Sequence, residues 1–170
     1  RAPGRGAATP GPLPSPVFAR PDLCTAPSAF ARPGQQTLGG GEVGDTCETA
    51  VEVTGLPFNH DGYTCPWAND YDEACPYTGS TAPDVVYSYT PVANQTVLAS
   101  LCTPGTNTSY DTKLYVYATT CSGTPVGCND DSCSSPLYSN YVSQLEVALT
   151  AGTTYYFVVD GYGTASGNYT

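Results

Sequence analysis

Apolar and polar residues alternate along most of the chain after residue 41. Such runs stand at 85–89, 97–101, 114–117, 145–149 and 155–159, and 50–54 is predicted as the first strand. A period of two places alternate side chains on opposite faces of a sheet, and no helical period of 3.6 residues is sustained. The pattern predicts an all-β domain, an antiparallel β-sandwich of roughly seven to nine strands. Residues 167–170 begin one more strand where the sequence stops, which predicts either a truncated sequence or an incomplete sheet edge.

Residues 1–41 have a different composition from residues 42–170. They hold eight of the 16 prolines and four of the five basic residues. Proline fixes φ and removes a backbone donor, so this segment is predicted to be an extended arm that ends in a hinge at Gly39–Gly41. Its apolar positions are Val17, Phe18, Leu23, Cys24, Phe30 and Leu38.

The overall charge excludes several classes of partner. The chain has 15 acidic and five basic residues, a net charge of −10 and a pI near 4.1. Nucleic acids and anionic membrane surfaces are bound by Lys and Arg, so we expect neither as a partner. No run of about 18 apolar residues is present, which argues against a transmembrane helix.

Eight cysteines indicate an oxidising compartment. No Cys-x-x-Cys pair is present, which favours disulfides over a zinc site. The absence of Met indicates a processed or engineered N-terminus, and together these features predict a secreted protein, extracellular or at the cell surface. Spacing does not determine the connectivity; the expected pairs are Cys65–Cys75, Cys121–Cys128, Cys102–Cys133 and Cys24–Cys47.

Five segments after residue 42 follow one another in a familiar order and spacing. They are Gly44–Cys47, Pro83–Tyr89, Tyr110–Tyr117, Cys128–Asp131 and Ala151–Tyr162. In these segments the chain resembles the bacterial pre-peptidase C-terminal (PPC) domain family, in its cysteine-containing secreted versions. The resemblance implies a jelly-roll β-sandwich that is usually a non-catalytic appendage of secreted proteases and other surface proteins, with a suspected role in binding insoluble substrates. The chain departs from the family in lacking a neighbouring catalytic domain and the usual final strand.

Catalysis is not expected. His60 is the only histidine, no Gly-x-Ser-x-Gly motif accompanies it, and its place beside Asn59 and Asp61 is typical of a turn. Acidic pairs are so frequent in this chain that a pair suitable for glycoside hydrolysis carries little weight. We therefore expect a protein that is not an enzyme.

Calcium is the better candidate for chemistry. Asn129, Asp130 and Asp131 occupy a short loop, and Asp111 and Asp160 stand at strand ends that a sandwich would bring to the same edge. Hard Ca²⁺ binds six to eight oxygens, several of them from carboxylates. The alternative is a solvated acidic turn whose Asn and Asp serve the turn itself. A second acidic loop, 69–73, is a weaker candidate.

The loop between Cys65 and Cys75 carries aromatic residues that suit ligand stacking. Trp67 and Tyr71 lie inside it, with Tyr63 and Tyr77 on either side. Such a group suits stacking on sugar rings or on a partner protein, whereas the alternative is a Trp that caps the core.

Two sequons in turns, at Asn94 and Asn107, predict a glycoprotein in a host that glycosylates its secreted proteins.

Two functions follow from these features. The arm carries four Arg and one Asp, whereas the body carries 14 acidic residues and one Lys. Opposite charges on one chain favour an extracellular structural protein whose arm docks on the body of a neighbour, giving a homo-oligomer or filament. The alternative for the arm itself is a flexible linker to a neighbouring domain that has been lost. The alternative is a carbohydrate- or protein-binding targeting module of a secreted hydrolase, for which a polysaccharide would be the partner.

Overall fold

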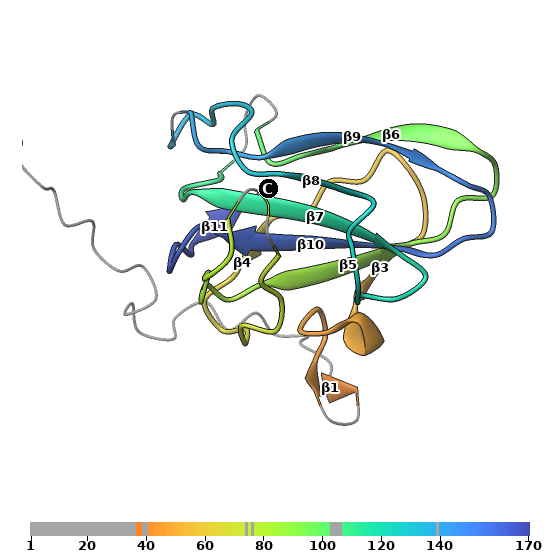
Figure 1. Cartoon of the computed structure of the whole chain (residues 1–170), viewed down its shortest axis with the longest axis horizontal. Coiled ribbons are helices and arrows are strands. Elements are labelled where there is room, and N and C mark those ends of the chain that lie inside the picture. Colours follow the sequence, from red (N-terminus) through yellow and green to blue (C-terminus); the bar gives the residue numbers. More distant parts are fainter. Residues whose placement is uncertain (1–36, 39–40, 74, 76, 103–106, 139) are drawn as a thin grey trace, which may run out of the picture.

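The computed structural model describes residues 37–38, 41–73, 75, 77–102, 107–138 and 140–170. The alternating segments form its longer strands, which confirms the all-β prediction (Figure 1). These strands are β5 (Val85–Tyr89), β6 (Gln95–Ser100), β7 (Thr112–Ala118), β9 (Gln144–Leu149) and β10 (Tyr155–Gly161). The shorter strands are β1 (Thr37–Leu38), β2 (Gly41–Glu42), β3 (Val51–Val53), β4 (Gly62–Tyr63), β8 (Gly127–Asn129) and β11 (Asn168–Tyr169). The predicted arm lies outside the described residues except for β1 and β2.

Helical structure is minor, as the periodicity indicates. Within the described part of the chain it is limited to the 3-10 helix η2 (Cys47–Thr49). In that part, no helix is both long enough and apolar enough to span a bilayer.

The main sheet has five strands in the order β3-β5-β10-β7-β8. Strand β10 is central, because it pairs antiparallel with β5 on one side and with β7 on the other. Strands β6 and β9 form a separate antiparallel ribbon, and β4 pairs with β11. The prediction of a wholly antiparallel arrangement is wrong at β3, which runs parallel to β5. Alternation carries no information on strand direction, and the long connection over residues 54–84 allows the parallel return.

One face of the main sheet packs against the ribbon. In Figure 1 the β6–β9 ribbon lies above the main sheet, and β8 is the sheet strand next to it. Val116 and Tyr155 of the sheet share a buried cluster with Val147 and Leu149 of β9. Their alternate positions place these side chains in the interior, as the period of two predicts.

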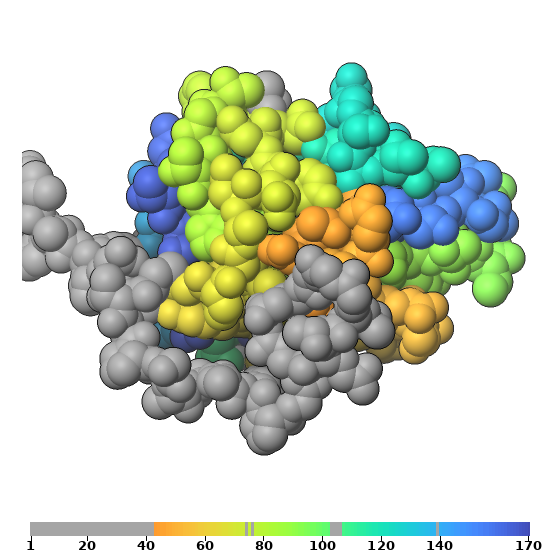
Figure 2. Space-filling view, turned by 90° about the horizontal axis from the view of Figure 1, so that it is seen from below, coloured from red at the N-terminus to blue at the C-terminus, as the bar shows by residue number. Residues whose placement is uncertain are grey.

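The opposite face of the same sheet is covered by loops. Val86, Tyr115 and Val158 are fully buried there together with Cys75, which belongs to the long connection 64–84. Figure 2 shows the yellow and yellow-green surface of this connection next to the orange residues of the η2 region. Since both faces are covered, the central strands have apolar or aromatic residues on both sides rather than clean alternation with polar ones.

Three disulfides join described residues. They are Cys47–Cys121, Cys75–Cys128 and Cys102–Cys133, with Cα–Cα distances of 6.1, 5.9 and 6.1 Å. The expected Cys102–Cys133 pair is confirmed. Several disulfides indicate an oxidising, extracellular environment.

The other expected pairs are wrong. Cys75 bonds Cys128 rather than Cys65, and Cys121 bonds Cys47 rather than Cys128. The Cys24–Cys47 pair is excluded for the same reason, and Cys24 itself lies outside the described residues. Cys65 is also disulfide-bonded, to a partner beyond the described part of the chain. The prediction failed because it paired cysteines close in sequence, whereas the observed bonds join segments that meet only after the sheet has formed.

Candidate functional sites

Three carboxylates meet at one end of the β7–β8 pair. Asp111 directly precedes β7, and Asp130 and Asp131 directly follow β8. The antiparallel register, with Leu114 opposite Asn129, brings these two strand ends together. One oxygen from each of the three carboxylates lies within 4.8 Å of the others. The structure thus assembles a cluster that can hold a metal ion, and oxygen donors suit a hard cation.

Asp130 is the buried member of this cluster, and one of its carboxylate oxygens lacks a hydrogen-bond donor among the described residues. Its side chain is only 9% exposed, and its Oδ1 has no hydrogen-bond partner among the described residues. Burial, reinforced by the charge of Asp131, raises the pKa of Asp130 to about 6, against a smaller opposing effect of Lys113. A buried carboxylate oxygen without a partner is costly. A bound cation would provide the missing partner and reduce the repulsion between the two carboxylates.

Of the two other predicted metal ligands, Asn129 adjoins the cluster in sequence, whereas Asp160 lies elsewhere. The side-chain oxygen of Asn129 accepts a hydrogen bond from the Gln144 amide and so fixes β8 against β9. The carboxylate of Asp160 accepts from the Tyr115 hydroxyl and from the Gly161 amide. Asp160 lies on the loop-covered face of the sheet, outside the three-carboxylate cluster. In the weaker candidate loop 69–73, Asp72 and the Glu73 carbonyl contact Lys113 on this same loop-covered face.

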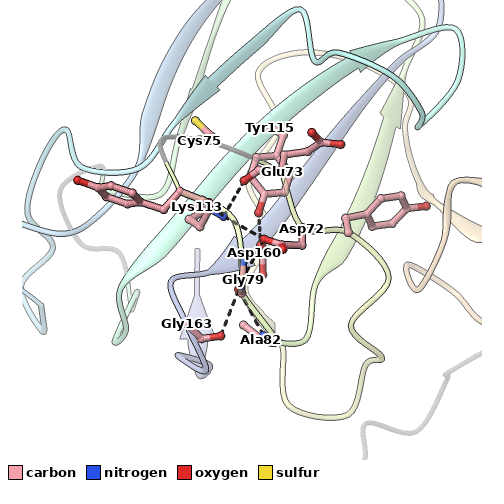
Figure 3. Close-up of polar contacts among 12 residues, drawn as sticks. Asp72, Glu73, Cys75, Gly79, Ala82, Lys113, Tyr115, Asp160 and Gly163 are labelled. Carbon is pink, nitrogen blue, oxygen red and sulfur yellow. Dashed lines mark hydrogen bonds and ion pairs between the residues drawn. The ribbon is translucent and has the colours of Figure 1, made fainter.

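A buried lysine organises that loop-covered face (Figure 3). Lys113 is 1% exposed, and its ammonium donates to the carbonyls of Glu73 and Tyr77 at 2.9 and 3.0 Å. It also pairs with Asp72 Oδ1 at 3.7 Å and lies 5.3 Å from the centre of the Tyr115 ring. Lys113 therefore holds the 72–77 segment onto β7. Sequence reasoning noted it only as the one basic residue of the body.

Two carboxylates are fully buried in the same loop-covered region. Asp84 and Asp160 are both 0% exposed. Burial raises the pKa of Asp84 to about 8, although the amides of Tyr71 and Asp70 partly stabilise its charge. Burial raises the pKa of Asp160 to about 7, opposed by its hydrogen bond from Tyr115. Both groups favour the neutral form in the folded protein much more than an exposed Asp does.

The four predicted stacking residues do not form one platform. Trp67 packs against the core and its indole donates to the Tyr63 carbonyl at 3.1 Å, as expected for a Trp that caps the core. Tyr71 packs against the Tyr117 ring, and its hydroxyl accepts from the Cys47 amide.

Tyr77 alone of the four is strongly exposed, at 61%. Its ring lies edge-on to Tyr162, which is 46% exposed, with centroids 6.1 Å apart. These two tyrosines form the exposed aromatic pair on this side of the molecule.

An apolar groove of about 160 Å³ opens on the other face of the sheet. Its lining includes Tyr87 and Phe157 of the main sheet, Val97 and Ala99 of β6, and the 56–60 segment. Leu56 and Phe58 from that segment remain 47% and 44% exposed. The groove thus extends the interior of the protein to its surface, and sequence reasoning did not predict it.

A chain of hydrogen bonds lies in this groove. Tyr87 is 7% exposed, and its hydroxyl contacts Nδ1 of His60 at 2.8 Å and the Tyr169 hydroxyl at 2.7 Å. Burial raises the pKa of Tyr87 well above its usual value. His60 also packs against Phe58, so the only histidine stabilises the groove wall.

Both predicted glycosylation sites are exposed. Asn94 accepts a hydrogen bond from the Ala151 amide through its side chain, and the Asn107 amide donates to Thr170 Oγ1. Glycosylation at either position stays a prediction.

Searches of protein-family models, curated proteins and solved structures find no match to this chain. The resemblance to the PPC family therefore stays a prediction.

Proposed function

We propose that this is a non-catalytic extracellular structural protein that self-assembles. In this proposal the basic arm of one copy docks on the acidic body of the next. Such a contact joins two different surfaces, so it can repeat along a filament instead of closing as a dimer. The body is then a PPC-like jelly-roll sandwich, and the order of its strand segments in the sequence supports this assignment.

One observation carries the proposal. Lys113 is the only Lys or Arg in the described part of the chain, and it is 1% exposed. The surface of the described residues therefore presents carboxylates and no accessible Lys or Arg to pair with them. The remaining four basic residues of the protein are all in the arm. Opposite charges on the arm and on the body favour association between copies, and they set the orientation of that association.

Sedimentation velocity of the full chain tests this proposal. We expect oligomers at about 50 mM salt and progressive dissociation toward about 500 mM, because salt screens charge attraction. Replacing the four arm arginines by Gln should abolish assembly, whereas replacing them by Lys should largely preserve it. These positions are Arg1, Arg5, Arg20 and Arg32. A wild-type protein that stays monomeric at high concentration contradicts the proposal.

We also propose that the cluster of Asp111, Asp130 and Asp131 binds Ca²⁺. The number of carboxylates and the buried, partnerless Oδ1 of Asp130 support this cation. A ligand that binds only the folded state stabilises it by about 2.7 kcal/mol at 100 times its Kd. Ca²⁺ should therefore raise the Tm of the EDTA-treated protein, and Asp131→Asn should reduce the increase. Asp61→Asn is a control of equal charge change, and a Tm unaffected by Ca²⁺ contradicts the site.

The second candidate function is a targeting module for polysaccharide or protein. The exposed pair of Tyr77 and Tyr162 favours it, because exposed aromatic rings can stack on sugar rings. Pull-down on cellulose, chitin and collagen tests this function, with Tyr77→Ala as the variant. Retention that is lost in Tyr77→Ala and kept in Trp67→Phe supports it, and no retention on any of the three contradicts it.

A further inference from the structure

We propose that the segment Val17–Arg20 of one copy occupies the apolar groove beside β6 of a neighbouring copy. This inference rests on the proposed self-assembly and names its contact. It defines the groove as a site for an added strand, and the side chain of Phe18 as its apolar anchor.

The groove lies on the side of β6 that has no strand partner in the described chain. Strand β6 pairs with β9 through all six of its residues, and among the described residues no third strand joins the sheet formed by the two. The groove is lined by Val97, Ala99 and other residues of β6 but by no residue of β9. It therefore borders the edge of β6 that faces away from β9.

This edge has the chemistry that strand addition requires. In an antiparallel ribbon, alternate residues of an outer strand direct their backbone amide and carbonyl groups away from the partner strand. An incoming extended segment can pair with these groups, and its alternate side chains then enter the groove. The groove provides apolar contacts for them from Leu56, Phe58 and Phe157.

The arm contains a short motif that suits this groove. The sequence Phe-Ala-Arg-Pro occurs at 18–21 and again at 30–33. Proline cannot donate to a strand partner, so the segments between prolines are the ones available for pairing. In an extended segment Phe18 and Arg20 lie on the same side, so Phe18 can fill the groove while Arg20 reaches its end.

A carboxylate stands at that end. Thr170 lines the groove, and its hydroxyl donates to Asp61 Oδ1 at 2.6 Å. Asp61 is exposed and lies next to His60, another lining residue. The groove therefore offers an apolar recess followed by a negative charge, which matches the order Phe-Ala-Arg.

The two Phe-Ala-Arg-Pro motifs differ in the length of chain between each of them and β1. Phe30 stands seven residues before β1, and Phe18 stands 19 residues before it. At about 3.1 Å per residue for a Pro-rich extended chain, these correspond to about 20 and 60 Å. A domain of this size is about 35–40 Å across. Phe18 can thus reach the groove of a neighbouring copy, whereas the chain between Phe30 and β1 spans at most about 20 Å.

Two substitutions of the full chain provide a matched test. Phe18→Ala should raise the concentration needed for assembly about tenfold or more, as expected for a buried aromatic anchor. Phe30→Ala removes the same side chain from the same motif and should leave assembly nearly unchanged. If Phe30→Ala weakens assembly as much as Phe18→Ala does, the choice of segment is wrong.

A photo-crosslink locates the contact directly. Phe18 is replaced by p-benzoyl-phenylalanine, and the variant is mixed with ¹⁵N-labelled wild-type protein before irradiation and peptide mapping. We expect crosslinks to peptides covering 54–61 or 95–101 of the labelled chain. Crosslinks within one chain exclude the neighbour as the acceptor. Crosslinks to other surfaces while assembly persists overturn the groove and leave the proposed function standing, whereas a monomeric wild type overturns the function itself.

Discussion

The two faces of the five-stranded sheet are covered in different ways. The face toward β6 and β9 is apolar, and its cover leaves a groove beside β6. The opposite face is covered by the 64–84 connection, which is held by the Cys75–Cys128 bond, by Lys113 and by buried carboxylates. On one face the covering 64–84 connection is held by a disulfide and by buried charges. On the other face the β6–β9 ribbon packs through apolar side chains and leaves the groove open.

We expect the loop-covered face to contribute to stability and the groove beside β6 to contribute to assembly. Loops without regular structure bury little apolar surface, so bonds of other kinds must hold them in place. The ribbon side also has a disulfide, Cys102–Cys133, but its cover consists of paired strands with buried apolar side chains and leaves room for a further segment. We therefore expect substitutions on the loop-covered face to affect unfolding, and substitutions in the groove to affect assembly.

The largest effect is expected from the disulfide on the loop-covered face. Replacing both Cys75 and Cys128 by Ala should lower the free energy of unfolding by about 4 kcal/mol, because this bond closes a long loop in the unfolded chain. Their separation in sequence is 53 residues. Denaturant unfolding measures the change, and a loss below about 1 kcal/mol contradicts this view of the cover.

Lys113→Met should have the next largest effect, a loss of about 3 kcal/mol. It removes the donor from two buried carbonyls and the positive partner of Asp72. Thermal and denaturant unfolding measure this loss. A surface substitution such as Val92→Thr, at a side chain 98% exposed, is the control and should change little. Equal stability of Lys113→Met and the wild type contradicts the role of the lysine.

The pH dependence of stability tests the buried carboxylates. Because the folded pKa of Asp84 is raised to about 8, the folded state binds more protons than the unfolded state above about pH 4. The free energy of unfolding should therefore fall as the pH rises from about 4 to 8. Asp84→Asn should reduce this slope and be more stable than the wild type at pH 8 by an amount of order 2 kcal/mol. Val92→Thr, at an exposed position without a titrating group, should keep the wild-type slope, and a slope unchanged in Asp84→Asn contradicts the prediction.

The smallest effect on stability is expected in the groove wall. Phe58→Ser should lower the free energy of unfolding by less than about 1 kcal/mol, because the side chain is already 44% exposed. The same substitution should weaken assembly. A large loss of stability with unchanged assembly would show that Phe58 serves the fold instead of the docking site.

The sequence predicted the features that local patterns determine. Alternation located the five long strands, and the spacing of Asp111 from Asp130 and Asp131 indicated that their strand ends meet. It did not predict the parallel direction of β3 or two of the disulfides, because both depend on which distant segments the folded sheet brings together. Asp160 was grouped with the metal ligands because it ends a strand. Its side chain instead faces the loops that cover the opposite side.

The buried lysine and the groove were beyond sequence reasoning for another reason. Lys113 occurs in a strand of Leu, Tyr and Val, and only the folded 72–77 segment supplies the carbonyls that make its burial favourable. The groove exists because no described strand pairs with the outer edge of β6. Most of the residues that line the groove are apolar and alternate like core residues, so their sequence does not indicate an open edge.

The Cys47–Cys121 bond has a mechanical consequence. In the proposed filament, tension on an arm would enter the body near residue 42, just before η2 and the three-residue strand β3. Without a crosslink, this pull would peel β3 from β5, one hydrogen bond after another. The disulfide diverts the force to the turn between β7 and β8. From there it loads the seven-residue ladder between β7 and β10 at the centre of the sheet.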